Sequence, residues 1–237
     1  MIDARRILSY MRRAVDDYEM IAGGDKICVG VSAGKDSLTL LCALAQLRLF
    51  YPHKFELIGI TLDPGFGADY SPVAALCAEL GVEYRVIPTD IAEIVFDIRK
   101  EKNPCSLCAN LRRGILNDSA KAARCNKVAL AHHMDDAVET FMMNLIHEGR
   151  LAAFAPVTYL DRRDITVIRP LIYAPEKEIR HFAAKAGLPV VHNPCPANGS
   201  TERSRVKEML AEWSGANRGV KNRIFGAMQR GGISGFK

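Results

Sequence analysis

Residues 26–37 read Lys-Ile-Cys-Val-Gly-Val-Ser-Ala-Gly-Lys-Asp-Ser, and the fold class is predicted from this segment. Its first half, residues 26–31, is a short apolar run with β-branched side chains, which predicts a buried strand. Small residues follow, and the apolar residues 38–49 after them predict a helix. A strand, a small-residue loop and a helix in succession place the loop at the carboxyl end of a strand, where open α/β sheets bind ligands.

The loop at residues 32–37 has the composition of a phosphate-binding cradle. Backbone N–H groups at the start of a helix attract anions, Lys35 adds a positive charge, and Ser32 and Ser37 add hydroxyl donors. A Walker A loop needs four residues between its glycines, whereas here three separate the two glycines and Asp36 follows the lysine. The Walker motif and the dinucleotide-binding G-x-G-x-x-G motif are therefore excluded.

Strands and helices alternate on both sides of this loop. Further strands are expected at residues 55–62, 84–88, 127–131 and 166–169. Further helices are expected at residues 4–21, 71–80, 91–100, 110–123, 135–146, 176–186 and 202–213. This alternation predicts an α/β fold, a mostly parallel sheet with helices on both faces. We expect one domain over residues 1–237, with an N-terminal helix at 4–21 and a basic C-terminal tail at 215–237.

The composition is that of a globular protein, with 49% hydrophobic and 25% charged residues among 237. No apolar run approaches the roughly 20 residues of a spanning helix. Residues 1–20 also lack the apolar core of a signal peptide, so we expect a cytoplasmic protein. A net charge of +5 permits nucleic-acid binding without proving it. The basic tail fits both a flexible solvated segment and sequence-independent RNA contacts.

Acidic residues follow two other predicted strands. Asp63 comes directly after the strand at 55–62, and residues 131–136 read Ala-His-His-Met-Asp-Asp. Because the carboxyl ends of parallel strands share one edge of a sheet, we expect these side chains to face the same crevice. Carboxylates beside a triphosphate require a divalent cation between them, and Mg²⁺ is the expected ion. Asp135 and Asp136 also suit the N-cap of the following helix.

Seven cysteines in a reducing compartment favour metal or redox chemistry over disulfides. Cys105 and Cys108 form one C-x-x-C, which does not suffice for a zinc ribbon, and Cys195 lies in a proline-flanked loop. Three thiolates would leave one corner of a cubane cluster open for an exogenous ligand such as sulfide. Structural zinc with His192 as the fourth ligand is the alternative. The remaining cysteines are expected to be buried structural thiols: Cys28, Cys42, Cys77 and Cys125.

Taken together, these motifs resemble the TtcA family, the tRNA 2-thiocytidine synthetases of the PP-loop ATP-pyrophosphatase superfamily. The resemblance spans nearly the whole chain. It rests on the joint occurrence of the S-G-G-x-D-S-like loop at 32–37, the C-S-L-C with paired arginines at 105–113, and the H-H-x-D-D at 132–136. Ala33 replaces the middle glycine of the family loop. Glycine adopts a positive φ at low energetic cost, whereas alanine does not.

The resemblance implies an adenine nucleotide α-hydrolase-like fold and a set of binding residues. Phosphates would be held by residues 32–37: Ser32, Ala33, Gly34, Lys35, Asp36 and Ser37. His132 and Asp136 would belong to the nucleotide site, and Cys105, Cys108 and Cys195 would ligate a [4Fe–4S] cluster. The last motif of the family usually holds two cysteines, but here asparagine replaces the second. A three-cysteine cluster survives that change, whereas a four-cysteine site does not.

The implied reaction is ATP-dependent tRNA thiolation. ATP would adenylate the C2 oxygen of a pyrimidine, expected to be cytidine, and sulfur would then replace that oxygen. Mg²⁺ and Lys35 would neutralise phosphate charge, and Asp135 or Asp136 would orient the base or handle protons. Arg112 and Arg113 would bind the RNA backbone. Expected partners are tRNA and a sulfur donor, either a cysteine desulfurase or sulfide, and a homodimer is compatible with the sequence.

Three other functions remain open from the residues alone. A PP-loop ligase or amidotransferase without sulfur chemistry would need the loop and the strand-end acids, but not the three cysteines. A non-enzymatic iron–sulfur or zinc module that binds RNA would not need the phosphate loop. A cluster-dependent desulfurating enzyme would share the cysteines, and ATP dependence would separate it from a thiolase.

Overall fold

The computed structural model describes residues 4–100, 104–191, 195 and 202–237. Its strands are β1 (Lys26–Gly30), β2 (Glu56–Asp63), β3 (Glu83–Pro88), β4 (Lys127–Ala129), β5 (Val157–Leu160) and β6 (Ile165–Ile168). Its α-helices are α1 (Arg5–Asp17), α2 (Lys35–Phe50), α3 (Ser71–Glu79), α4 (Pro104–Ala122), α5 (Met134–Glu148), α6 (Glu176–Lys185), α7 (Glu202–Ala216) and α8 (Val220–Arg230). A π-helix, η1 (Glu93–Ile98), and two 3₁₀ turns, η2 (Asp161–Arg163) and η3 (Ile233–Gly235), complete the elements.

The strands form one six-stranded sheet in the order β3-β2-β1-β4-β6-β5. All neighbouring strands are parallel except β5, which pairs antiparallel with β6 at the edge. The predicted α/β fold with a mostly parallel sheet is therefore confirmed, although β5 was not expected. The chain runs outward from β1 in one direction through β2 and β3, and in the other through β4 and β6. The loop after β1 thus lies where the strand order reverses, the usual ligand-binding position in such sheets.

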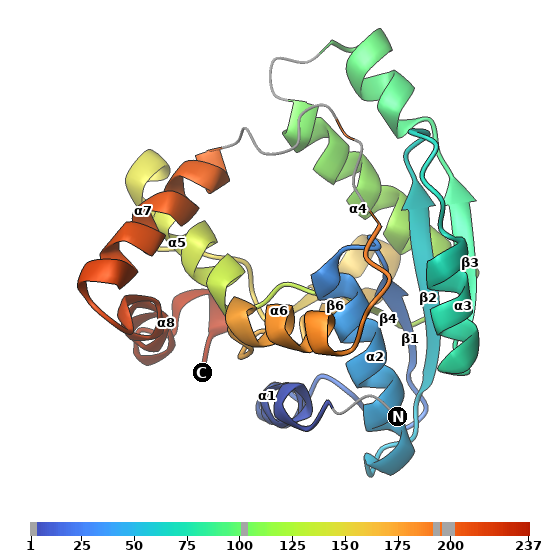
Figure 1. The fold of residues 1–237 in the computed structure, drawn as a ribbon, viewed down its shortest axis with the longest axis horizontal. Helices are drawn as coiled ribbons and strands as arrows, with labels where there is room; N and C mark the ends of the chain where they lie inside the picture. Colours follow the sequence, from blue (N-terminus) through green and yellow to red (C-terminus); the bar gives the residue numbers. More distant parts are fainter. Residues whose placement is uncertain (1–3, 101–103, 192–194, 196–201) are drawn as a thin grey trace.

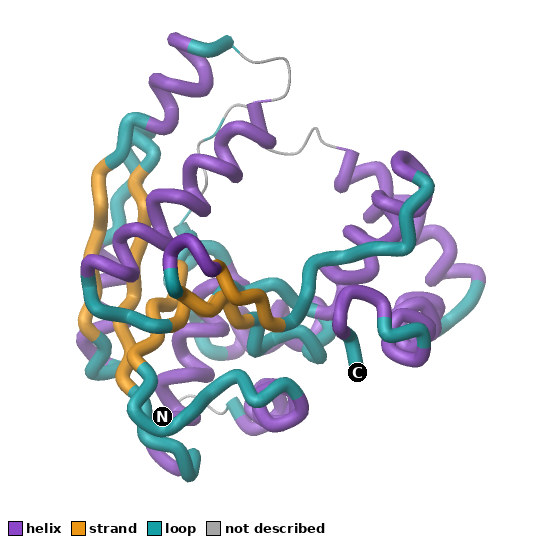
Figure 2. Tube along the Cα trace, turned by 180° about the vertical axis from the view of Figure 1, so that it is seen from behind, coloured by secondary structure: helices purple, strands orange, loops and turns teal. Residues whose placement is uncertain are grey.

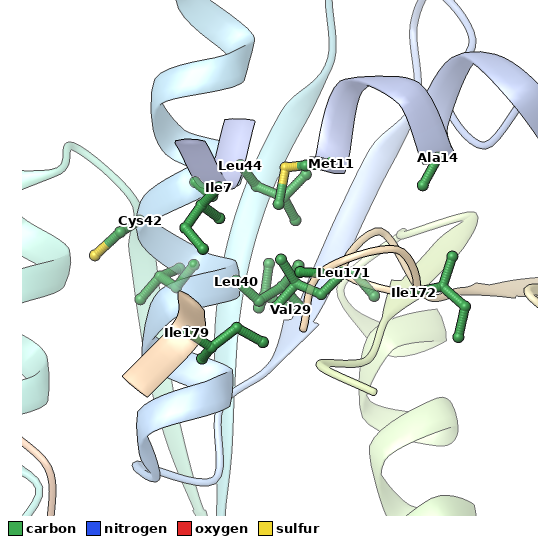
Figure 3. Close-up of a cluster of buried hydrophobic side chains, with 14 of the residues drawn as sticks. Ile7, Met11, Ala14, Val29, Leu40, Cys42, Leu44, Leu171, Ile172 and Ile179 are labelled. Carbon is green, nitrogen blue, oxygen red and sulfur yellow. The ribbon is translucent and has the colours of Figure 1, made fainter. Parts of the chain in front are cut away.

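The hydrophobic core lies on both faces of this sheet, as the alternation of strand side chains requires. On one face, Ile27 and Val29 pack with buried residues of α1, α2, α5 and α6, and Figure 3 shows Val29 beside Leu40 of α2. On the other face, Cys28 packs with Leu116 and other residues of α4. Helices therefore cover both faces, as predicted, and α4 stands against the sheet next to its carboxyl-terminal edge.

The C-terminal region is folded and does not form a flexible solvated tail. α8 packs against α5 and α7, and it buries Phe225 and Met228. Figure 1 shows α5, α7 and α8 grouped away from β2 and β3, and Figure 2 shows the same separation from behind. The backbone N–H of Lys237 donates to the hydroxyl of Tyr18, 3.0 Å away, so the chain ends against the segment that follows α1. The burial of aromatic side chains stabilises this folded C-terminal region. A count of charges in the sequence cannot reveal that burial.

The largest differences from the predicted helix boundaries lie at the end of α1 and the start of α4. α1 ends at Asp17, because the chain turns there to bury Met20 and Ile21 instead of continuing the helix to residue 21. α4 begins at Pro104, whereas the prediction began it at residue 110. Proline is favoured in the first turn of a helix, where it lacks only an N–H that would have no partner. Cys105 and Cys108 consequently lie on the first turns of α4 and not in a preceding loop.

Within the described residues, no helix is long and apolar enough to cross a membrane.

Candidate functional site

A cavity of about 840 Å³ opens at the carboxyl-terminal edge of the sheet. Pockets for small ligands and cofactors typically measure roughly 300–1,000 Å³, so this one suits a nucleotide. Its walls include the phosphate loop, the segment after β2, α4, the ends of β4 and β6, and the start of α7. Residues from these elements that line it include Ser32, Gly34, Phe66, Tyr70, Arg112, Arg113, His132, Phe154, Arg169 and Arg203.

The phosphate loop is held by its own serines. The backbone N–H of Ser32 donates to Oγ of Ser37 at 3.1 Å, and Oγ of Ser37 donates to the carbonyl of Gly34 at 3.0 Å. Ser37 is buried and shapes the loop from inside, whereas Ser32 is exposed at the cavity. The two serines expected to bind phosphate therefore differ, since the exposed Ser32 is the one that can reach a ligand.

Ala33 adopts the conformation that its side chain was expected to disfavour. Its φ is +60°, in the left-handed region, and its side chain is buried. Its carbonyl accepts a hydrogen bond from the N–H of Val191 at 3.0 Å. For an L-residue this conformation costs roughly 1–2 kcal/mol, and burial of the methyl group returns about 0.8 kcal/mol. The loop thus keeps a glycine-like backbone at position 33 although alanine stands there.

Lys35 is held between two carboxylates at the start of α2. Its Nζ lies 2.9 Å from Oδ1 of Asp36 and 3.2 Å from Oε1 of Glu176. Glu176 also pairs with Lys207 of α7 at 2.8 Å. Burial alone would raise the pKa of Glu176, but Lys207 and Lys35 outweigh it and lower that pKa to about 2. Glu176 was not predicted as a site residue, although its position directly after Pro175 at a helix start is a recognisable signal.

The two aspartates in the first turn of α5 hold elements of the fold together. Asp136 and His133 form a capping box, in which Nδ1 of His133 accepts from the N–H of Asp136 at 3.3 Å. His133, and neither aspartate, is therefore the N-cap of α5. Asp135 accepts from the N–H of Glu176 at 2.7 Å and from Nζ of Lys221 at 2.9 Å, which fastens α6 and α8. Asp136 also accepts from Arg203 of α7 at 3.3 Å, and neither aspartate is among the residues that line the cavity.

One wall of the cavity combines His132, Phe154 and Arg169. The rings of His132 and Phe154 lie 4.8 Å apart, and the guanidinium carbon of Arg169 lies 5.0 Å from the Phe154 ring centroid. Nε of Arg169 donates to Nδ1 of His132 at 3.3 Å. His132 was expected here, but Arg169 and Phe154 were not. An arginine directly after a parallel strand was the only signal for Arg169, because its partner lies 37 residues away.

The predicted cluster cysteines come from two segments. Cys105 is exposed on α4, and Cys108 and Cys195 are half-buried. Burial raises the pKa of Cys108, Arg112 opposes that rise, and the thiols of Cys195 and Cys105 add to it. The sulfur atoms of Cys105 and Cys195 therefore each lie within electrostatic range of that of Cys108. In the part of the chain that the structure describes, no three His, Cys, Asp or Glu side chains form a group able to hold a metal ion. His192, the alternative zinc ligand, lies outside the described residues.

The remaining predicted residues lie around the cavity. Arg112 and Arg113 line it from α4, and Nε of Arg112 is buried with no hydrogen-bond partner among the described residues. Asp63 ends β2, where its Oδ1 accepts from the N–H of Gly65 at 3.0 Å, and it stands beside the cavity-lining Pro64. The cavity thus brings together several arginines and a phosphate loop, an arrangement suited to polyanionic ligands.

Comparison with known proteins gives this site a context. Residues 5–213 match the family model described as the PP-loop domain. A tRNA-cytidine(32) 2-sulfurtransferase of Geobacter sulfurreducens is 41% identical over 230 residues, covering 94% of this chain and 89% of the relative. The protein of the same name from Geobacter metallireducens is 42% identical, with the same coverage.

Solved structures give the same picture. The U34-tRNA thiolase NcsA from Methanococcus maripaludis, with its [4Fe-4S] cluster, superposes with a TM-score of 0.75 at 26% identity. The match covers 94% of this chain and 78% of that one. An NH3-dependent NAD synthetase from Campylobacter jejuni has a TM-score of 0.53 at 14% identity, covering 97% and 93%, a likeness of fold alone.

Proposed function

The chain belongs to the PP-loop domain family and, within it, to the tRNA-cytidine(32) 2-sulfurtransferases, and from this premise we propose how its cavity thiolates tRNA. The activity is ATP-dependent exchange of oxygen for sulfur on a tRNA base, which we assign to C2 of a cytidine. One observation carries the proposal. A single cavity is bounded by a phosphate loop on one side and, on the other, by the helix that bears two candidate cluster cysteines and two arginines.

The reaction proceeds in two steps. The C2 oxygen of the base attacks the α-phosphorus of ATP, the bond from that phosphorus to the pyrophosphate oxygen breaks, and pyrophosphate leaves. Hydrosulfide then forms a bond to C2, the bond from C2 to the adenylated oxygen breaks, and AMP leaves with that oxygen as the proton of sulfur is lost. Adenylation is needed because an unmodified carbonyl oxygen is a poor leaving group.

The phosphate loop supports the first step. Ser32, the N–H groups of the loop and Lys35 face or flank the cavity, and they would bind the triphosphate. Mg²⁺ binds through one or two carboxylates together with phosphate oxygens and waters, so it needs no preformed group of three protein ligands. Asp36 and Asp63 are the carboxylates that we assign to it, one at the start of α2 and one at the end of β2.

We propose that Cys105, Cys108 and Cys195 would hold a [4Fe–4S] cluster with one open corner, although the described residues do not gather these side chains into a preformed metal-binding group. Cys105 and Cys108 are three residues apart on one helix and therefore lie on the same face, and the charge of Cys195 reaches Cys108. When bound, the cluster supplies an iron with a free coordination position for sulfur. The sulfur donor that we propose is sulfide, or a cysteine desulfurase whose persulfide sulfur is released as hydrosulfide by an added thiol reductant, which is oxidised to a disulfide.

The RNA-binding part of the proposal rests on arginines. Arg112, Arg113 and Arg203 line the cavity from α4 and α7, and guanidinium groups are well suited to phosphate recognition. We assign Arg112 and Arg113 to the RNA backbone near the target base. We also propose a cytoplasmic location, where tRNA is modified. A homodimer remains compatible with the fold, and the described contacts do not require one.

The decisive experiment measures iron, acid-labile sulfide and tRNA thiolation together. Wild-type protein purified anaerobically should hold about four irons and four sulfides. Cys105→Ala and Cys195→Ala should lose both metal and thiolation, whereas Cys125→Ala, a change in the core beneath α4, should keep the cluster. Thiolation by the wild type should also require ATP and disappear in Lys35→Ala.

Two results would contradict the proposal. Zinc without sulfide would replace the cluster by a structural metal site, and the chemistry would then be base activation without sulfur transfer. Removal of sulfur from tRNA without ATP would instead point to a desulfurating enzyme, because such a reaction does not need the phosphate loop.

A further inference from the structure

The two adjacent histidines after β4 have different partners. His133 is buried, and its Nδ1 is occupied as the N-cap of α5 by the N–H of Asp136. His132 instead lines the cavity, with its ring against Phe154. His133 therefore serves the fold, and His132 is the histidine that a ligand in the cavity can reach.

Arg169 determines which nitrogen of His132 carries the proton. Its Nε lies 3.3 Å from Nδ1 of His132, and a guanidinium can donate hydrogen bonds but never accept them. Nδ1 must therefore be the accepting nitrogen, which leaves the proton of the neutral ring on Nε2. The guanidinium is itself fixed, because NH1 of Arg169 also donates to the carbonyl of Ala155 at 2.6 Å.

The surroundings also keep this ring neutral. Burial, followed by the positive charge of Arg169, lowers the pKa of His132 to about 4. Arg169 stays charged, since burial and then Arg113 lower its pKa only to about 10. Among the described residues, no hydrogen bond is formed by Nε2 of His132. The wall of the cavity thus presents a rigid N–H donor that none of the described residues uses.

We propose that Arg169 is a positioning residue that fixes His132 as a neutral Nε2–H donor to a non-bridging oxygen of the ATP α-phosphate. The inference rests on the proposed adenylation, in which the oxygens on the α-phosphorus gain negative charge as the base oxygen attacks. Ser32 and Gly34 of the phosphate loop line the same cavity as His132, so one ligand can contact both.

A neutral imidazole suits this task for a physical reason. It stabilises developing charge through a hydrogen bond placed in advance, and it keeps its proton throughout, so no proton transfer has to accompany the step. An imidazolium could lose its proton to the phosphate or to solvent, and the nearby arginines make that form unfavourable. The positive charge of Arg169 further polarises the ring toward a stronger donor at Nε2.

The first test needs no turnover. In protein labelled with ¹⁵N at histidine, long-range ¹H–¹⁵N spectra show which ring nitrogen carries the proton. We expect the His132 ring of the wild type to be bare at Nδ1 and protonated at Nε2. Arg169→Met should abolish that preference, because it removes the donor to Nδ1. A His132 ring with its proton on Nδ1 in the wild type would overturn the inference.

The second test is single-turnover release of pyrophosphate from ATP in the presence of tRNA. His132→Phe and Arg169→Met should slow this step by roughly 10²-fold or more, with much smaller changes in ATP affinity, because the hydrogen bond strengthens in the transition state. His132→Gln retains an N–H donor and should recover much of the rate. Arg163→Met removes an exposed arginine that pairs with Asp118, and it should leave the rate unchanged.

The outcomes separate this inference from the proposed function. An unchanged adenylation rate in His132→Phe, or an equal loss of rate and ATP affinity, would overturn the transition-state role. A wild-type chain that releases no pyrophosphate with tRNA would overturn the proposed function and the phosphate acceptor with it. A reversed tautomer in an active wild-type chain would overturn the role of Arg169 alone.

Discussion

At the scale of single residues, Glu139 of α5 is a buried carboxyl group with an oxygen that lacks a hydrogen-bond partner among the described residues. Its side chain is 2% exposed, and Oε1 has no hydrogen-bond partner among the described residues. Burial, followed by the charge of Asp136, raises the pKa of Glu139 to about 7, although nearby cationic side chains oppose the rise. The folded chain therefore binds a proton on Glu139 over a pH range in which the unfolded chain has lost it.

The stability of the protein should accordingly depend on pH through Glu139. Because the folded pKa lies above the unfolded one, the contribution of Glu139 is fully present at low pH and is lost as pH rises toward 7. Glu139→Gln cannot ionise, so its stability relative to wild type should increase between pH 5 and pH 8 by up to about 3 kcal/mol. Urea unfolding of both proteins at the two pH values measures this, and an equal difference at both would refute it.

Ala33 shows a different compromise at a single residue. Its left-handed backbone places a methyl group where it is 1% exposed, beside the phosphate loop. Glycine would remove the backbone strain, but it would also lose the buried methyl group and gain freedom in the unfolded chain, which favours unfolding by roughly 0.4–1 kcal/mol. These contributions are of similar size, so alanine is tolerated at this position of the loop.

At the scale of elements, Asp135 connects three helices. It lies in the first turn of α5, accepts from the first N–H of α6, and pairs with Lys221 of α8. Only 9% of the Asp135 side chain is exposed, so both interactions form away from bulk water. These contacts favour a structural role for a residue that the sequence analysis assigned to catalysis.

Asp135→Asn should therefore destabilise the fold by about 2–4 kcal/mol, because the half-buried Lys221 loses its counter-charge and one donor loses its acceptor. Hydrogen exchange should show the loss first in α8. Asp118→Asn is the matched control, since its pair with Arg163 is exposed and should contribute less than about 1 kcal/mol. A folded, fully stable Asp135→Asn protein without adenylation activity would restore the catalytic assignment.

Two helices connect the parts of the site across the whole molecule. α4 carries Cys105 and Cys108 at its start and the cavity-lining arginines one turn later. α7 follows the segment of Cys195 and reaches the nucleotide side of the cavity through Arg203 and Lys207. Figure 1 shows these two helices at separate places around the molecule, with α7 beside α5 and α4 beside β2. The candidate cluster ligands therefore come from the first turns of α4 and from Cys195, which precedes α7 in the sequence.

The salt dependence of tRNA binding should reflect the phosphate contacts made by the arginines of α4. Each phosphate contact that is lost reduces the slope of log affinity against log salt by about one. Arg113→Met should weaken tRNA binding at low salt and reduce this slope. Arg85 lies on the edge strand β3, where it pairs with Glu83 at 2.6 Å. Arg85→Met should change neither the affinity for tRNA at low salt nor the slope. Titrations at several salt concentrations measure both, and parallel slopes for Arg113→Met and wild type would exclude a phosphate contact.

Local patterns in the sequence determined the fold class and the chemistry of this protein. The apolar run at 26–31, the small-residue loop after it and the later alternation predicted the parallel sheet, because burial and backbone freedom are read from neighbouring residues. The phosphate loop and the C-x-x-C were likewise recognisable from neighbouring residues, because each motif is defined by spacing within a few positions. Membership of the TtcA family, the tRNA-cytidine(32) 2-sulfurtransferases, was expected from these motifs and is confirmed by the relatives.

Only the tertiary structure decided which charged side chains meet. The adjacency of β4 and β6 brings Arg169 to His132, and the packing of α6 on α2 brings Glu176 to Lys35. Strand order and helix packing depend on the burial of the whole chain, so no local pattern encodes these pairs. The sequence contains many possible partners for each charged side chain. Which of them it contacts depends on which elements the packing of the core brings side by side.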